Sequence, residues 1–208
     1  MVGGQLWWKR IYEESIMGRP KKINTFISCP NKDFSFLVLT RGQVSIVDND
    51  DIDKIKGYGW YANYTSHNRQ YQTTANISLD NGNKRKLYLS RIIMDALDGV
   101  EVDHINHNRL DNRKSNLRLC NRRENLCNRP ANSSNTSGYK GVVFHKRDKK
   151  WQASIRTKKG RIHLGYFNSA IEAATAYNQA ALKYHKEFAC LNDLSAVNYG
   201  GKEYMRKA

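Results

Sequence analysis

The chain has 208 residues, with 35 Lys and Arg against 19 Asp and Glu, so its formal net charge at pH 7 is +16. With 39% hydrophobic residues it can bury at least one modest core, which excludes collagen, a coiled coil and full disorder, and its length favours one or two small domains. No apolar run reaches the roughly 18 residues that span a bilayer, and no apolar stretch with a cleavage site follows Lys9 and Arg10, so we expect neither a membrane span nor a secretory signal.

The first 33 residues are predicted to be an irregular basic segment. Residues 18–22, Gly-Arg-Pro-Lys-Lys, resemble the minor-groove core of an AT-hook, although a plain basic tail explains this single copy better. Met17 is an alternative start of the chain.

From residue 34 to residue 94, short runs with β character alternate with turn signals, which predicts a small antiparallel sheet. The expected strands are residues 42–47, 60–64, 71–77 and 86–93, with one short helical turn at residues 50–55.

Residues 101–130 are polar and rich in asparagine, so this segment cannot form a core by itself. A Ser/Asn-rich stretch at residues 130–137 follows and is predicted to be a linker between two domains.

Three further strand-like runs occupy residues 139–145, 151–156 and 161–167, and each connection is short enough for a hairpin. Ser169 and Glu172 have the spacing of a capping box, and alanines at helical spacing follow them. We expect a three-stranded antiparallel sheet packed on one helix, with Trp151, Tyr166 and Phe167 supplying much of the buried surface. The predicted fold class is therefore α+β.

The segment from Val102 to Asn125 carries Asp103-His104-Ile105-Asn106, then Asn116-Leu117-Arg118, then Asn125. This order and spacing closely resemble the HNH endonuclease family, whose core is a β-hairpin and a helix around one divalent cation. The preceding β-rich region also resembles the N-terminal part of phage-type HNH enzymes, so we treat the two as one module.

The resemblance implies a role for each matching residue. Asp103 and Asn125 become metal ligands, His104 the general base, and Asn116 the residue that holds the loop and fixes the His104 ring. Independently, oxygen ligands suit Mg²⁺ or Mn²⁺, and a neutral imidazole can accept a proton from water. Arg118 is a candidate contact to the DNA backbone.

Alternatives remain for this segment. His107 is either a second ligand or, preferably, a surface turn residue. Cys120 and Cys127 with His104 and His107 could be imagined as a zinc site, but the spacing does not fit a zinc knuckle. Two further interpretations stay open: the segment is a polar loop without a functional site, or the protein is a catalytically inactive relative of the family. We expect the four cysteines, at positions 29, 120, 127 and 190, to be reduced and the protein to be cytoplasmic, in a bacterial or phage-infected cell.

Residues 138–192 resemble the plant ethylene-response-factor (Apetala-type) DNA-binding domain, through Tyr139-Lys140-Gly141-Val142, Leu164-Gly165-Tyr166-Phe167 and Leu191-Asn192. Members of this family contact bases in the major groove with the exposed face of their sheet. The resemblance therefore implies that double-stranded DNA is the partner. It also implies that four residues contact the DNA: Lys140, Trp151, Arg156 and Arg161. Val143 and His145 stand where the plant domains usually have arginines, so the target sequence is expected to differ. Residues 137–192 carry 11 basic and 3 acidic groups, a net charge of +8 that favours a polyanionic partner.

The predicted organisation is a basic segment (1–33), an HNH nuclease module (34–129), a linker (130–137), the Apetala-type domain (138–192) and a tail (193–208). The predicted function is a homing-type, site-directed DNA endonuclease with one divalent metal and no obligate protein partner. A non-catalytic DNA-binding regulator is the alternative from another class, and an RNA nuclease or RNA-binding protein is a third.

Overall fold

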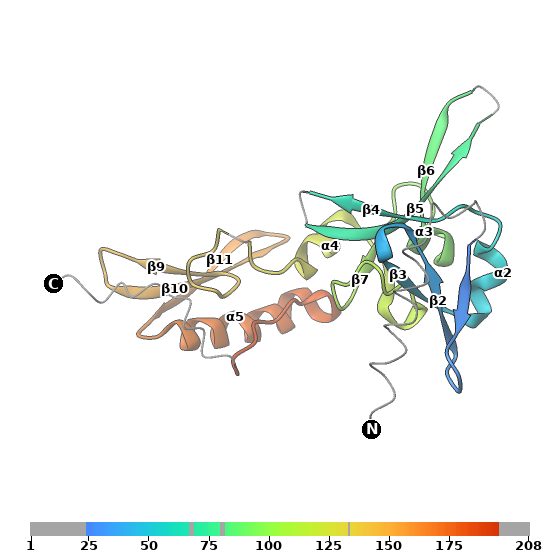
Figure 1. The fold of residues 1–208 in the computed structure, drawn as a ribbon. Helices are drawn as coiled ribbons and strands as arrows, with labels where there is room; N and C mark the ends of the chain where they lie inside the picture. The colour runs from blue at the N-terminus through green and yellow to red at the C-terminus, as the bar shows by residue number, and fades with distance from the viewer. Residues whose placement is uncertain (1–23, 67–68, 80–81, 133, 196–208) are drawn as a thin grey trace. The chain divides into compact units, whose positions relative to one another are not determined.

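The computed structural model describes residues 24–66, 69–79, 82–132 and 134–195, and these form an α+β protein (Figure 1). The chain divides into two compact units, an N-terminal unit that ends at Asn121 and a C-terminal unit that begins at Arg122. No helix in the described ranges is long and apolar enough to cross a membrane. The AT-hook-like residues 18–22 and the alternative start at Met17 lie outside the described residues.

The N-terminal unit opens with an antiparallel sheet of β1 (Phe26–Ser28), β2 (Phe34–Val38) and β3 (Val44–Asp48), in the order β1-β2-β3. A single 3-10 turn, Thr40–Gly42, separates β2 from β3. The expectation that the first 33 residues are irregular is wrong for β1. Its pairing with β2, from Phe26 opposite Leu37 to Ser28 opposite Ser35, gives this short segment partners that sequence patterns do not reveal.

The second sheet holds β4 (Tyr61–Thr65), β5 (Gln70–Ser78) and β6 (Lys84–Tyr88), in the order β4-β5-β6. The helical turn predicted for residues 50–55 is confirmed as a 3-10 turn, Asn49–Asp51, followed by α2 (Ile52–Ile55).

The strand predicted for residues 86–93 is half wrong, because it ends at Tyr88 and α3 (Leu89–Ile93) follows it. Leu89 and Ile93 are both buried in the core of the unit. Four residues apart, they share one face of the helix, as they also would on a strand, so their spacing did not reveal the helix. The β-branched residues at positions 92 and 93 are the reason that the run reads as a strand.

The asparagine-rich region forms the hairpin β7 (Glu101–His104) and β8 (Leu117–Cys120), a 3-10 turn (Lys114–Asn116), and α4 (Arg122–Asn128). The division between the units falls immediately before α4, so this helix is grouped with the C-terminal unit. The arrangement of hairpin and helix around a metal stays a prediction.

The C-terminal unit contains β9 (Val142–His145), β10 (Lys150–Thr157) and β11 (Gly160–Phe167) in the order β11-β10-β9, then α5 (Ala170–His185) and a 3-10 turn, Lys186–Phe188. The Ser169 side chain accepts a hydrogen bond from the Glu172 backbone N–H at 3.1 Å, which is one half of the expected capping box. The Glu172 carboxylate accepts instead from the backbone of Asn168.

The core of this unit differs from the expectation at one aromatic residue. Tyr166 is 44% exposed on the outer face of the sheet, whereas Tyr139 and Tyr177 are buried at 3% and 2%. Trp151 and Phe167 do pack against the core. Strand alternation places Tyr166 outward because its neighbour Phe167 already points inward.

Gly141 allows the closest backbone approach in this core. Its φ is +76°, and a β-carbon there would lie 2.1 Å from Cδ2 of Tyr177 and 2.7 Å from the carbonyl oxygen of Ser154. Gly141→Ala should therefore destabilise the C-terminal unit by about 2 to 5 kcal/mol, combining overpacking with left-handed backbone strain. The measurement is hydrogen-exchange protection of the β10 amides.

Gly160→Ala is the control, because Gly160 also has positive φ, +119°, but its β-carbon would meet no atom within 4 Å. It should cost only the backbone strain, about 1 to 2 kcal/mol. Equal loss of protection in the two variants would contradict the packing argument.

Candidate active site

The β7–β8 hairpin places Asp103 and His104 side by side at the end of β7. The antiparallel register sets Asp103 opposite Arg118 and His104 opposite Leu117. The predicted metal ligand Asp103 and the predicted general base His104 therefore share one short, hydrogen-bonded ribbon.

Asp103 is 6% exposed, and its carboxylate forms an ion pair with Arg118. The Nε and Nη2 groups of Arg118 donate to Oδ2 at 2.9 and 2.7 Å. Arg118, the candidate DNA contact, thus points its guanidinium at the predicted metal ligand. The ion pair offsets the cost of burying the carboxylate and fixes its orientation.

His104 is positioned by a side chain that the sequence did not single out, Asn112. The His104 Nε2 lies 3.2 Å from Oδ1 of Asn112, while the Asn112 Nδ2 donates to the Ser45 hydroxyl at 2.8 Å and faces the carbonyl of Arg109 at 3.4 Å. A carbonyl can only accept, so these contacts fix which end of the amide is oxygen. Nε2 must then carry the hydrogen of the neutral ring, and Nδ1 keeps the lone pair that can accept a proton.

The electrostatic surroundings keep this ring neutral. Burial, the largest effect, lowers the pKa of His104 below its ordinary value. The Asn112 hydrogen bond acts to raise this pKa, the charge on Arg109 lowers it, and the charges on Asp103 and Asp111 raise it by less. A ring with a depressed pKa is a free base near neutral pH, which is the form that a general base requires.

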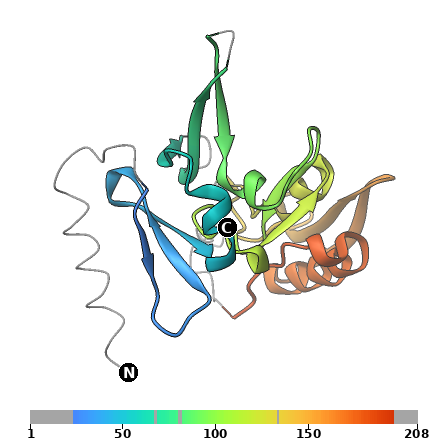
Figure 2. The same cartoon turned by 90° about the vertical axis from the view of Figure 1, so that its right-hand side faces the viewer.

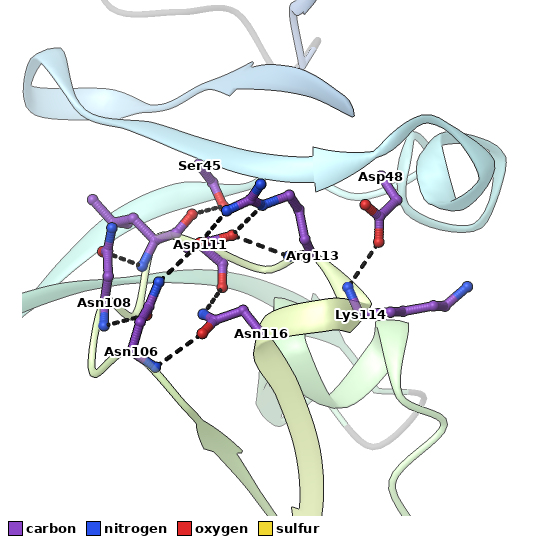
Figure 3. Close-up of polar contacts among 9 residues, drawn as sticks. Ser45, Asp48, Asn106, Asn108, Asp111, Arg113, Lys114 and Asn116 are labelled. Atoms are coloured by element: carbon purple, nitrogen blue, oxygen red, sulfur yellow. Dashed lines mark hydrogen bonds and ion pairs between the residues drawn. The ribbon is translucent and has the colours of Figure 1, made fainter. Parts of the chain in front are cut away.

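The loop between the two strands is organised around Asp111 and Asn116 (Figure 3). Asn116 accepts from the Asn106 backbone N–H at 2.9 Å and donates to the Asp111 carbonyl at 2.8 Å. Arg113 donates to both carboxylate oxygens of Asp111, at 2.8 and 2.7 Å. Burial acts to raise the pKa of Asp111, but the Arg113 hydrogen bonds outweigh it and hold the pKa below its usual range. Asn116 therefore closes the loop, and its own backbone carbonyl accepts from Ile105 at 2.9 Å.

The loop is attached to β3 of the first sheet. Ile46 and Asp111 form a parallel bridge, in which the Ile46 N–H donates to the Leu110 carbonyl and the Asn112 N–H donates to the Ile46 carbonyl, both at 2.8 Å. The Lys114 backbone N–H donates to Asp48 at 2.7 Å (Figure 3). A loop without a core of its own is in this way held by a strand some 65 residues away in the sequence.

His107 lies in the turn that begins this loop, where its backbone N–H donates to the His104 carbonyl at 3.0 Å. Its φ of +64° is in the left-handed region that suits glycine or asparagine better. The turn geometry accounts for the position of His107 without a ligand role.

Asn125, the second predicted metal ligand, lies on α4 in the C-terminal unit. In the described part of the chain, no cluster of three or more His, Cys, Asp or Glu side chains could hold a metal ion, which includes the zinc alternative at Cys120 and Cys127. By their chemistry, a carboxylate and an amide oxygen are donors that suit a hard cation, since Mg²⁺ is commonly held through one or two carboxylates together with waters and substrate phosphates. A metal site that Asp103 and Asn125 share stays a prediction.

Of the four predicted DNA contacts in the C-terminal unit, two are exposed on the sheet and two are partly buried. Arg156 and Arg161 pair directly across β10 and β11, and both are exposed. Trp151 faces inward, with its ring 5.0 Å from that of Phe144. Lys140 donates to the carbonyls of Cys127 and Arg129, each at 2.5 Å, and its burial lowers its pKa.

A cleft of about 570 Å³ in this unit gathers much of the positive charge. Its lining contains five Lys or Arg residues and no Asp or Glu. The cations are Arg123, Lys140, Arg156, Lys158 and Arg161. Such a lining attracts an anion as large as a phosphate group of a nucleic acid.

Sequence reasoning missed Asn112, Ser45 and Asp111 as parts of the site. The dense asparagines of residues 106–112 were a signal for a hydrogen-bonded loop, but not for which asparagine meets the His104 ring. Ser45 had no signal, because its contact depends on the folding of β3 against a distant loop.

Comparison with known proteins places these residues within a recognised family. A family model described as HNH endonuclease matches residues 97–127. Uncharacterized HNH endonuclease L560 of Acanthamoeba polyphaga mimivirus is 29% identical over 168 residues, which are 77% of this chain and 81% of the relative. Protein 3.8 of Escherichia phage T7 is 32% identical over 91 residues, 44% of this chain and 74% of the relative.

A separate similarity is to APETALA2-like protein 2 of Oryza sativa, 39% identical over 51 residues, which are 24% of this chain and 12% of the plant protein. No solved structure matches the chain significantly. The match of residues 97–127, the segment that builds the Asp103–His104 hairpin and its loop, together with the viral relatives, shows that the chain belongs to the HNH endonuclease family.

Proposed function

We propose that this protein is a homing-type, site-directed DNA endonuclease that hydrolyses phosphodiester bonds with one divalent metal, Mg²⁺ or Mn²⁺. The observation that carries the proposal is the neutral His104 ring, held by Asn112 next to a buried Asp103. A fixed base beside a fixed carboxylate is the minimum equipment for activating water next to a phosphate.

In the proposed reaction, Nδ1 of His104 takes a proton from the water that attacks the scissile phosphorus. The bond from phosphorus to the leaving ester oxygen breaks as the new bond forms, and that oxygen takes a proton from solvent water. The Asn112 amide keeps the opposite nitrogen protonated, so the ring cannot turn its lone pair away from the substrate. Asn116 holds the backbone of the loop that carries this geometry. A divalent cation held by Asp103 and Asn125 would neutralise negative charge that develops on the phosphate.

Arginine side chains on the sheet of the C-terminal unit support a positioning role for that unit. Arg156 and Arg161 form an exposed pair across β10 and β11, and both belong to the lining of the cationic cleft. We propose that this Apetala-like unit binds double-stranded DNA and sets where the nuclease cuts.

One observation favours a second function, a DNA-binding regulator without catalysis. The Asp103 carboxylate is paired with Arg118, and a guanidinium at 2.7 Å competes with any cation for the same oxygen. Tight DNA binding without cutting in any metal would support this alternative.

The first test is a supercoiled-plasmid nicking assay with Mg²⁺ or Mn²⁺, using DNA that includes the genomic flanks of the gene. His104→Ala should lower the metal-dependent rate by about 10² to 10⁴-fold, the usual contribution of a general base. His107→Asn is the control, since asparagine tolerates the positive φ of this neighbouring turn position. An unchanged rate in His104→Ala would rule out the proposed base.

The pH profile tests the role of Asn112. The active form of His104 is neutral and its pKa is lowered, so activity should fall only at a pH below the ordinary pKa of histidine, about 6.5. Asn112→Asp puts a carboxylate against Nε2 and should raise the pKa of His104, moving the acid limb of the profile to higher pH.

Asn108→Asp is the matched control for this shift, because it adds the same charge at an exposed position of the same loop. Its acid limb should stay close to that of the wild type. The positioning role of Asn112 fails if both variants shift equally or if neither shifts.

The DNA-binding role predicts a change in salt dependence for the full-length chain. Arg156→Gln should weaken duplex binding and reduce the slope of log K against log[salt] by about 1, which corresponds to one phosphate contact. Lys183→Gln, on the exposed surface of α5, should leave the slope unchanged. If Arg156→Gln and the wild type have equal slopes of log K against log[salt], Arg156 does not contact a DNA phosphate.

A further inference from the structure

The β5–β6 hairpin extends away from the other strands of the N-terminal unit, as both views show (Figures 1 and 2). β5 pairs with β4 only from Gln70 to Thr74, and with β6 only from Thr74 to Ser78. Beyond Thr74 the hairpin is thus a two-stranded ribbon without a third strand in the described part of the sheet. Such a ribbon gains little stability by itself. Its projection from the unit therefore suggests that it binds another molecule.

The root of the ribbon is fixed to the body of the unit. Ala75 is fully buried, and Leu87, its partner across the ribbon, packs against the core. On the same face, Arg85 lies 3.7 Å from Asp98 in an ion pair. The anchored face therefore holds the ribbon in one orientation, and the opposite face is presented to solvent.

The opposite face consists of Asn76, Ser78, Lys84 and Lys86. The register sets Asn76 opposite Lys86 and Ser78 opposite Lys84, and side chains two residues apart on a strand share a face. All four residues are exposed. Among the residues that the structure describes, neither lysine forms an ion pair. This face therefore offers two cations, an amide and a hydroxyl.

The amide of Asn76 is also oriented. Its Nδ2 donates to the Tyr61 hydroxyl at 3.0 Å, which ties a side chain near the root of the ribbon to β4. An oriented asparagine opposite Lys86, with Lys84 two residues along the same face, is a suitable arrangement for contacts to both base edges and phosphates.

We propose that the face formed by Asn76, Ser78, Lys84 and Lys86 lies in the major groove of duplex DNA and is a second DNA-contacting surface, on the nuclease unit itself. The major groove of B-form DNA admits a two-stranded β-ribbon, and the positive charge of this face complements the phosphates that border the groove. The inference rests on the proposed function, which makes duplex DNA the substrate.

The test uses the full-length protein and duplex DNA that contains the genomic flanks. Lys84→Gln/Lys86→Gln should weaken binding and lower the slope of log K against log[salt] by about 2, and it should expose guanine N7 atoms to dimethyl sulfate that the wild type protects. Lys32→Gln/Lys56→Gln, exposed lysines of the same unit away from the ribbon, is the matched control and should change neither reading. Lys84→Arg/Lys86→Arg should restore the wild-type slope.

A slope and a protection pattern that stay unchanged in Lys84→Gln/Lys86→Gln would overturn the proposal. So would equal competition by duplex RNA, whose major groove is too narrow for a ribbon. Failure of the proposed nuclease is a separate result: the wild type then binds DNA and shows the ribbon-dependent slope but cuts in no metal.

Discussion

The parallel bridge between β3 and the loop after His104 is the interaction on which the candidate site depends. Its hydrogen bonds, between Ile46 and the backbone of Leu110 and Asn112, attach an asparagine-rich loop to a strand of the first sheet. The loop cannot supply apolar contacts of its own, because its side chains are mostly amides and charges. Its rigidity comes from the sheet, whose strands are held by the core that contains Leu37 and Val47. Without that sheet, Asn112 would have no fixed place from which to hold the His104 ring.

Burial and charge act together at this site. Burial lowers the pKa of His104, and the Arg113 hydrogen bonds hold the pKa of Asp111 below its usual range. Asp103 forms its own ion pair, with Arg118. Each buried carboxylate forms an ion pair with one arginine, Asp103 with Arg118 and Asp111 with Arg113. These pairs avoid the large cost of an unpaired buried charge. The result is a site that holds one neutral base among fixed charges. The same Arg118 that pairs with Asp103 would compete with a cation for the predicted metal ligand.

Positive charge is distributed over surfaces with different shapes. In the C-terminal unit, it lies on the outer face of a three-stranded sheet and in the cleft beside it. In the N-terminal unit, it lies on one face of a projecting ribbon. A sheet face and a ribbon suit the contour of a duplex in different ways, and on our proposals each unit would contact the same polyanion through its own surface.

The sequence by itself indicated the family, through the order and spacing of Asp103-His104, Asn116-Leu117-Arg118 and Asn125, and the short-strand character of both units, because such spacing is a local property. The bounds of the β7–β8 hairpin came from the structure. The sequence also predicted α5 and its Ser169 cap, which depend on neighbouring residues. The assignments of Asp103, His104, Asn116 and Asn125 to roles stay predictions. Tertiary structure alone decided that residues 89–93 are helical, that Tyr166 faces outward, and that Asn112 and Ser45 hold His104. These features arise from contacts between segments distant in sequence, where burial and hydrogen-bond partners override local propensity.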